Sequence, residues 1–210
     1  MIFKKLPFQL LISLCAVTIC TAQNFTLYKQ QLFGGNMQDI DLQMIEFNNK
    51  LVIAGRSMSL NPSGNKTTYN CIGPASAFVN SDIWMVMLDT ALNIIWQKSL
   101  GGSSSEYGLG SLIKTSDNHI MFACQSRSDS SCQKSENCKT FPFSDDDIWI
   151  CKLDSMGNVT ADKTFGSMRI DIGANIVELS DGNFIVVANN SAGTGLGPNI
   201  GYDKTVANIG

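Results

Sequence analysis

Three acidic residues recur at one position of a repeated pattern. Each follows the first glycine of a short motif by five residues: Asp39 after Phe33-Gly34-Gly35, Glu106 after Leu100-Gly101-Gly102, and Asp171 after Phe165-Gly166-Ser167. Carboxylates gathered from separate segments would act as general acid and base in hydrolysis, or as oxygen ligands for calcium. Because these acids recur with the fold itself, we favour a role in capping backbone amides of turns on a ligand-binding face.

A second acidic group, Asp145-Asp146-Asp147, offers oxygen atoms to calcium. It lacks the spaced Asp, Gly and Glu pattern of a dedicated calcium loop, so a solvated start of a strand is the favoured interpretation. The one histidine, His119, has no serine or cysteine motif beside it that a nucleophilic triad would need. The sequence therefore predicts no catalytic residue, no cofactor, and no metal site beyond these three weak calcium candidates.

Two tryptophans, Trp84 and Trp149, would suit the stacking of sugar rings. Each is the third residue of the phrase Asp-Ile-Trp, which begins at Asp82 and again at Asp147. Their identical places in the repeat favour packing between repeated units over contact with a ligand. We therefore expect both indole rings in the structural core.

The phrase that holds these tryptophans indicates the architecture. Residues 82–89 read DIWMVMLD, and residues 147–154 read DIWICKLD, about 65 residues further on. Self-similarity at a fixed period is typical of repeat folds, in which one unit cannot bury its apolar face alone. The repeats run approximately over residues 33–99, 100–164 and 165–210, and the last is partial.

Apolar runs joined by turn residues predict four antiparallel strands in each repeat. The predicted strands are 42–47, 51–55, 82–88 and 94–100 in the first repeat, 109–115, 120–124, 147–153 and 159–165 in the second, and 174–179 and 184–188 in the third. Tandem units of four antiparallel strands are the blades of a β-propeller. The predicted fold class is therefore all-β with propeller-like repeats, and a β-sandwich of about ten strands is the alternative.

The number of repeats is small for a propeller, which has about four or more blades. Residues 25–33 resemble a fourth strand without the three that should precede it, and the third repeat departs from the pattern after Ala188. We therefore expect a fragment of a longer propeller. Closure by association and an open stack of repeats are the alternatives.

The N-terminal residues 1–22 have the pattern of a secretory signal. Two lysines precede the apolar stretch Leu6 to Ile19, and Cys20-Thr21-Ala22 supplies small residues for cleavage. The stretch is shorter than the roughly 20 residues of a membrane span. We expect cleavage to leave one β-repeat domain, residues 23–210, secreted or at the cell surface. The periplasm and an uncleaved anchor are the alternatives.

Five cysteines would remain after this cleavage. Cys132 and Cys138 lie six residues apart in a polar loop, and in an exported chain they are the predicted disulfide. An odd total leaves at least one thiol unpaired. Cys124 and Cys151 lie in apolar strands and are expected as small buried residues, and the cysteine spacing does not suit zinc.

The composition excludes some classes of partner. The chain has 15 basic and 18 acidic residues and a formal net charge of −3. Such sparse and nearly balanced charge indicates neither a nucleic-acid surface nor an acidic tail. Glycine, serine and asparagine are abundant and favour turns, which fits many short strands.

Several of these residues together resemble a group of exported repeat proteins of the Bacteroidetes phylum. Units of that group contain Trp-x-Lys-x-x-Gly-Gly, an acid, Asp-Gly before an apolar strand, and Asp-x-Trp-x-x-Lys-Leu-Asp-x-x-Gly-Asn. The matching residues here are Trp96 to Gly102, Asp181-Gly182, Asp147 to Asp154, and Gly157-Asn158. The resemblance implies propeller-like blades and export. Many members carry a type IX secretion sorting domain, to which no segment of this sequence corresponds, and this adds to the expectation of a fragment.

The predicted strand order indicates which end of each unit would bind. The loop before the first strand and the loop joining the second to the third emerge at the same end, so the glycine turns share a face with loops 56–81 and 126–143. Loops on a rigid scaffold usually carry binding. We expect a non-enzymatic module that binds a glycan or a cell-surface protein, without nucleic acid or a membrane span after signal cleavage. A calcium-dependent carbohydrate-active enzyme and a structural or truncated remnant are the alternatives.

Overall fold

A computed structural model describes residues 29–71, 80–139, 146–166 and 170–190. All the strands described below belong to one compact unit, which begins at Phe33. The predicted signal, Asp145, and the chain after the third repeat's second strand lie outside the described residues.

The described residues form ten β-strands and no helix, as the all-β prediction requires. The strands are β1 (Asp39–Phe47), β2 (Lys50–Ser57), β3 (Asp82–Leu88), β4 (Ile94–Leu100), β5 (Glu106–Lys114), β6 (Ile120–Ser126), β7 (Asp147–Leu153), β8 (Val159–Phe165), β9 (Asp171–Glu178) and β10 (Phe184–Asn190). They pair in chain order into a first sheet (β1 to β4), a second sheet (β5 to β8) and a third sheet (β9 and β10). All the pairs are antiparallel, and no sheet is closed. Three sheets, rather than the two of a sandwich, are thus observed.

The strands at the middle of each four-stranded sheet explain the continuous apolar runs in the sequence. All seven residues of β3 are buried, and so are all seven residues of β7. A strand with both faces covered needs no alternation of polar and apolar residues. The predicted bounds of both strands, and those of β4 and β8, agree with the structure.

The first strand of each sheet begins earlier than predicted, at the recurring acid itself. In β1, two residues oppose one on β2 between Ile40 and Gln43, and Asp41 has a φ of 58°. Gly108 and Gly173 have positive φ values, 57° and 64°, near the corresponding irregularities of β5 and β9. These β-bulges interrupt the side-chain alternation, which is why the sequence pattern places the strand start too late.

The predicted leading strand, residues 25–33, is not a strand where it is described. Residues 29–33 have no strand structure, and residues 25–28 lie outside the described part. Phe33 packs against the buried cluster of Trp84, Val86 and Leu88. The segment therefore contributes an apolar side chain to the core although it does not form the predicted strand.

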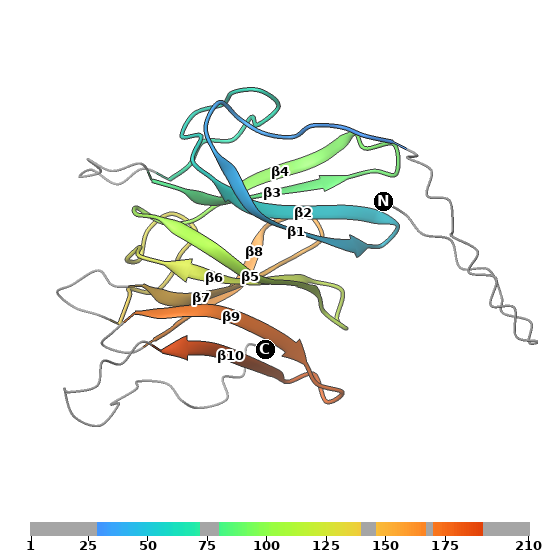
Figure 1. The fold of residues 1–210 in the computed structure, drawn as a ribbon. Coiled ribbons are helices and arrows are strands. Elements are labelled where there is room, and N and C mark those ends of the chain that lie inside the picture. Colours follow the sequence, from blue (N-terminus) through green and yellow to red (C-terminus); the bar gives the residue numbers. More distant parts are fainter. Residues whose placement is uncertain (1–28, 72–79, 140–145, 167–169, 191–210) are drawn as a thin grey trace, which may run out of the picture. The chain divides into compact units, whose positions relative to one another are not determined.

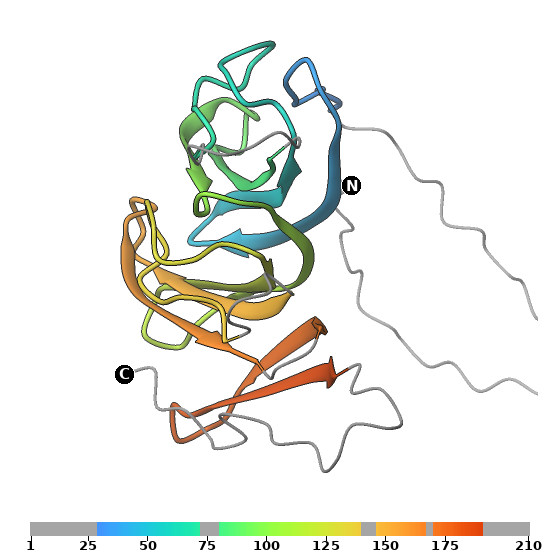
Figure 2. The ribbon, with the colours of Figure 1, turned by 90° about the vertical axis from the view of Figure 1, so that its left-hand side faces the viewer.

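The second sheet lies between the first and the third and is covered on both faces (Figures 1 and 2). On one side, Phe122 and Trp149 pack against Val52 and Ala54 of the first sheet. On the other side, Met121, Ala123 and Ile150 pack against the third sheet; its contributing residues are Ala174, Ile176 and Phe184. Hydrophobic burial between neighbouring sheets is therefore what makes the repeats one unit.

Truncation of Phe122 tests this packing. Its ring is fully buried and meets Trp149 edge to face, with 5.4 Å between ring centroids. We expect Phe122→Ala to lower the free energy of unfolding by about 3–5 kcal/mol, because a cavity replaces the ring. Urea denaturation measures the loss. The control is Met156→Ala at a side chain that is 62% exposed, and an equal loss in both variants would contradict the packing.

Candidate functional site

Strand pairing brings the polar turns and loops of the first two sheets to one end, here called the loop end. Asp39 of β1 pairs with Ser57 of β2, and Ser57 pairs with Asp82 of β3. The same register joins the start of β5, the end of β6 and the start of β7. The loop end therefore holds the glycine turns before β1 and β5 and the loops joining β2 to β3 and β6 to β7, as the strand order predicts.

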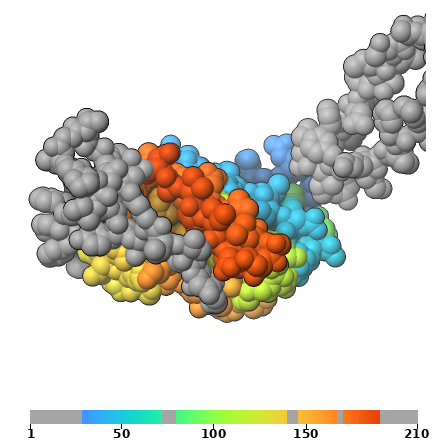
Figure 3. Space-filling model, turned by 90° about the horizontal axis from the view of Figure 1, so that it is seen from below, coloured from blue at the N-terminus to red at the C-terminus, as the bar shows by residue number. Residues whose placement is uncertain are grey.

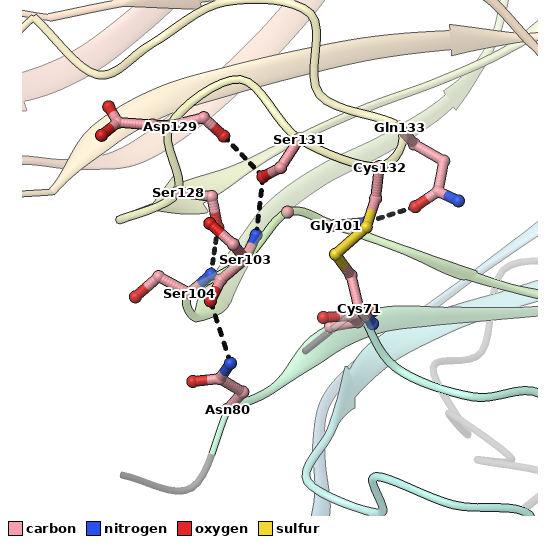
Figure 4. Close-up of a disulfide and its surroundings, with 12 residues drawn as sticks. Cys71, Asn80, Gly101, Ser103, Ser104, Ser128, Asp129, Ser131, Cys132 and Gln133 are labelled. Carbon is pink, nitrogen blue, oxygen red and sulfur yellow. Dashed lines mark hydrogen bonds between the residues drawn. A yellow bond between two sulfur atoms is a disulfide. The ribbon is translucent and has the colours of Figure 1, made fainter. Parts of the chain in front are cut away.

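Serine side chains of the β6–β7 loop hold the glycine turn before β5 (Figure 4). The backbone N–H of Ser103 donates to Ser131 Oγ at 2.8 Å, and that of Ser104 donates to Ser128 Oγ at 2.9 Å. The carbonyl of Ser103 accepts a bond from Asn80 Nδ2 at 3.1 Å. These hydrogen bonds hold the turn against the described parts of both loops, where the polar groups satisfy one another.

The first sheet repeats this arrangement with its own residues. The N–H of Met37 donates to Ser59 Oγ, and the N–H of Asn36 donates to Ser63 Oγ, each at 3.0 Å. Asn65 Oδ1 accepts from the N–H of Gly34 at 2.8 Å. The contact between turn and loop is therefore part of the repeat.

The recurring acids cap these turns from inside the protein. Glu106 Oε2 accepts the N–H of Gly102 at 3.0 Å, and Glu106 Oε1 accepts Ser126 Oγ at 2.7 Å. Asp39 Oδ2 likewise accepts the N–H of Gly35 at 2.9 Å. Glu106 is fully buried and Asp171 is 7% exposed. The capping interpretation is confirmed for Asp39 and Glu106, whose carboxylates contact turn amides.

The recurring acids of the second and third sheets, Glu106 and Asp171, each interact through their charge with an aspartate that begins a strand of the preceding sheet. Asp82 is fully buried; its Oδ2 accepts the N–H of Cys71 at 2.7 Å, and its Oδ1 has no hydrogen-bond partner among the described residues. A methyl group on Gly101 would collide with both Asp82 Oδ1 and Glu106 Oε2. The two carboxylates therefore converge on this glycine, and the Gly-Gly motif leaves them room.

The same relation recurs one repeat later. Asp147 is fully buried, its Oδ1 has no partner among the described residues, and a methyl group on Gly166 would collide with that oxygen. The charge of Asp171 disfavours ionisation of Asp147, as the charge of Glu106 does for Asp82. Two buried acid pairs thus mark the two boundaries between sheets.

Two buried lysines at the loop end oppose this negative charge. Lys66 is 1% exposed, and its Nζ donates to the carbonyl of Thr68 at 2.6 Å. Lys134 is 2% exposed, and its Nζ donates to Thr164 Oγ1 at 2.6 Å and to the carbonyl of Glu136. Lys66 interacts with the charges of Asp39 and Asp82, and Lys134 with those of Glu106 and Asp147. Each buried lysine therefore offsets part of the negative charge of two acids.

Burial shifts the pKa values of these groups. It raises the pKa of Asp82 to about 8, with a further contribution from the charge of Glu106. It raises the pKa of Glu106 to about 7, although the hydrogen bonds that Glu106 accepts act in the opposite direction. It raises the pKa of Asp147 to about 6 and lowers the pKa of Lys66. Desolvation, which penalises the charged form, is the largest cause in each case.

Neither the two lysines nor Asp82 stood out as candidate site residues in the sequence, and Asp147 was considered only as a calcium ligand. A repeated sequence pattern marks the two lysines: Ser-x-x-Lys occurs as Ser63-Gly64-Asn65-Lys66 and again as Ser131-Cys132-Gln133-Lys134. In each copy an isolated β-bridge between the serine and the lysine closes a turn. A lysine in a polar loop is usually solvated, and sequence spacing does not reveal that these two are buried.

The predicted disulfide between Cys132 and Cys138 is wrong. Cys132 is bonded to Cys71, 61 residues away, and the bond joins the two long loops of neighbouring sheets (Figure 4). Cys138 is a free buried thiol whose Sγ lies 3.3 Å from the carbonyls of Ser126 and Ser128. The sheet stacking brings distant loops together, so nearness in sequence misled the prediction. Cys124 and Cys151 are free and buried, as expected.

The two tryptophans lie in the core, as expected. Trp149 is fully buried and its Nε1 donates to Asp162 Oδ2 at 2.8 Å; Trp84 is 5% exposed and its Nε1 donates to Gln97 Oε1 at 3.1 Å. Each indole thus buries its apolar rings while its N–H keeps a partner, which suits packing rather than contact with a sugar.

The remaining predicted candidates do not come together. Asp146 pairs with Arg127, whose Nε lies 2.5 Å from Asp146 Oδ1, and Asp147 accepts the N–H of Lys139. His119 contacts Asp117 in the hairpin turn between β5 and β6, at the opposite end of the second sheet. Within the described ranges, no group of three or more His, Cys, Asp and Glu side chains has the geometry of a metal site.

The outer surface of the loop end carries an exposed aromatic side chain. Tyr69 is 68% exposed in the β2–β3 loop, next to the buried Asn70 and to Cys71 of the disulfide. The ring of Tyr107 is contacted by Arg56 and Arg127, whose guanidinium carbons are 5.6 and 5.5 Å from its centroid. Tyr69 is the more exposed of these two tyrosines.

No model of a known protein family matches the chain, and no curated protein matches it. In the part of the chain that the structure describes, no helix is long and apolar enough to cross a membrane.

The buried acids predict an unusual dependence of stability on pH. In an unfolded chain aspartate releases its proton near pH 4, whereas the folded protein holds protons on Asp82, Glu106 and Asp147 up to about pH 8, 7 and 6. Because the folded state binds more protons between these limits, its stability falls as pH rises from about 4 to 8. Urea unfolding across this range measures the slope.

Asp82→Asn isolates one contribution to that slope. An amide in this place keeps an oxygen for the N–H of Cys71 and carries no charge against Glu106. We expect the variant to be more stable than the wild type by about 1–3 kcal/mol at pH 8 and to lose part of the pH dependence. Glu46→Gln, at an exposed residue of β1, is the control. A variant with an unchanged slope would show that Asp82 is not protonated in the folded protein.

Removal of the disulfide should also lower the stability of the fold. We expect Cys71→Ser or Cys132→Ser to lower the free energy of unfolding by about 2–4 kcal/mol, because the bond closes a long loop in the unfolded chain. Cys138→Ser should retain the bond. Peptide mapping without reductant identifies the pair, and a fragment joining Cys132 to Cys138 would contradict the structure.

Proposed function

We propose that the chain is an exported, non-enzymatic binding module that engages a glycan through its loop end. The observation that carries the proposal is the exposed ring of Tyr69 on the β2–β3 loop. An aromatic side chain offers an apolar face to the C–H groups of a sugar and a hydroxyl for hydrogen bonding. Thr67, which is exposed two residues earlier, adds a further hydroxyl. A cell-surface protein is the other ligand class that the sequence favours.

The residues that follow Tyr69 are held by hydrogen bonds and a disulfide, which supports this role. The N–H of Asn70 donates to the carbonyl of Leu60, and Asn70 Nδ2 donates to the carbonyl of Ser57, both at 2.9 Å. Cys71 is tied to the neighbouring sheet by the disulfide. Because this backbone is already held in place, binding at Tyr69 would not require it to become ordered, which favours affinity.

Three further observations support the remaining parts of the proposal. Stacked sheets of four antiparallel strands favour propeller-like blades. A disulfide favours an oxidising compartment, in agreement with the signal pattern of residues 1–22 and the resemblance to exported repeat proteins. The carboxylates of Asp39 and Glu106 contact turn amides inside the protein, so they favour binding over catalysis by these acids.

Retention on immobilised polysaccharides tests the proposal. The protein, produced in an oxidising compartment, should bind one polysaccharide class saturably and release no product. We expect Tyr69→Ala to weaken this binding by about tenfold or more, which corresponds to about 1.4 kcal/mol or more.

Met156→Ala is the matched control, because Met156 is also exposed but lies in the β7–β8 turn at the opposite end. Absence of saturable binding, or an equal loss in both variants, would contradict the proposal. Release of oligosaccharide products would show an enzyme instead.

A further inference from the structure

The disulfide between Cys71 and Cys132 spans the boundary between the first two sheets, and both of its ends are tied to the buried acid pair there. The N–H of Cys71 donates to Asp82 Oδ2 at 2.7 Å. Gln133, the residue after Cys132, bonds to Gly101 twice (Figure 4). Its N–H donates to the carbonyl of Gly101 at 3.2 Å, and its Oε1 accepts the N–H of Gly101 at 3.3 Å. Each cysteine therefore lies one hydrogen-bonded contact away from Asp82 or Gly101.

The two carboxyl groups lie inside this ring of contacts. Asp82 and Glu106 converge on Gly101, both side chains are fully buried, and Asp82 Oδ1 has no partner among the described residues. The disulfide itself is accessible, because Cys132 is exposed and Cys71 is half-buried. A bond that a reductant can reach thus closes over two acids that water does not reach.

This bond is an addition to the repeat at one boundary. Asp147 Oδ2 accepts the N–H of Lys139, where the corresponding aspartate of the first sheet accepts that of Cys71. The turns closed by Ser-x-x-Lys likewise place Gly64 where Cys132 stands, and these two residues have positive φ values, 58° and 51°. The second boundary, which β9 and β10 form with the second sheet (orange to red in Figure 3), has acids like those of the first. Among the described residues it has no equivalent disulfide.

Charged and titratable groups from several elements face the acid pair. They are Lys66 and the thiol of Cys124 for Asp82, and Lys134 and the thiols of Cys124 and Cys138 for Glu106. Burial disfavours ionisation of both acids more strongly than the two lysines favour it, so the pKa values of Asp82 and Glu106 stay near 8 and 7. Entry of water at this boundary would remove the largest cause of both shifts and let the acids ionise at lower pH.

We propose that the Cys71–Cys132 disulfide is a redox latch for the buried acid pair: its reduction lets the first two sheets part at the loop end once the acids ionise. A dithiol supplies the two electrons and two protons of this step, which leaves two thiols on the chain and a disulfide in the reductant. Near pH 5 the acids are uncharged, so the boundary stays closed with or without the bond. Near pH 8.5 two carboxylates repel each other beside Gly101, and the disulfide holds the boundary shut. The latch does not depend on any glycan.

Amide hydrogen exchange tests the latch, because hydrogen bonds hold the N–H groups of Gly102, Ser103 and Ser104 in the glycine turn. A variant with both Cys71→Ser and Cys132→Ser stands for the reduced protein at any pH. Its acceleration of exchange at these three amides, relative to the wild type, should be greater at pH 8.5 than at pH 5 by about tenfold or more, after correction for the chemical rate. Amides of β3 and β7 should stay protected. A dithiol at pH 8.5 should reproduce the change in the wild type, and reoxidation should reverse it.

Asp82→Asn shows whether the acid pair is the cause. Added to the variant without the disulfide, it removes one of the two charges, so most of the difference between pH 8.5 and pH 5 should disappear. Glu46→Gln is the matched control, because Glu46 is an exposed acid near the opposite end of β1, and it should leave the difference intact. A difference that survives Asp82→Asn, or an equal acceleration at both pH values, would overturn the proposal. Loss of protection in β3 and β7 would also overturn it, because the whole fold would then open rather than one boundary.

Discussion

The capping of a glycine turn by a buried carboxylate is the constraint on which the loop end depends. Glu106 accepts the N–H of Gly102 and the hydroxyl of Ser126, and the N–H of Glu106 itself donates to the carbonyl of Ser81 at 2.7 Å. One residue thus ties a turn, the end of a neighbouring strand and the preceding sheet together. Without it, two buried donors would lose their acceptor, at a cost of about 1–3 kcal/mol each. The glycine turn before β5, the end of β6 and the residue before β3 are therefore held together by this one residue.

The cost of burying these acids explains why the repeats depend on one another. Asp82 belongs to the first sheet and Glu106 to the second, so the charge repulsion between them arises only when the sheets stack. Lys66 and Lys134, also buried, lower that cost through their positive charges. A single repeat would have neither its apolar faces covered nor its loop-end charges balanced. Stacking therefore sets the electrostatics of the loop end as well as the core.

The sequence predicted the features that depend on local pattern and failed where distant segments meet. The bounds of β3, β4, β7 and β8 followed from continuous apolar runs and turn residues. The starts of β1, β5 and β9 were missed because bulges break the alternation. The bond from Cys71 to Cys132 could not be inferred, because only sheet stacking brings these loops together. The burial of Lys66 and Lys134 was hidden for the same reason, since their partners come from other strands.

The loop end and the flat faces of the sheets are chemically distinct. Polar loops gather at the strand ends, and apolar side chains gather on the flat faces, because alternation along a strand sorts its residues by face and not by end. Addition of a further sheet to either face would extend the row of loops without altering the loops already present. Side chains of the loop end, such as Tyr69, can therefore vary while the contacts between sheets stay the same.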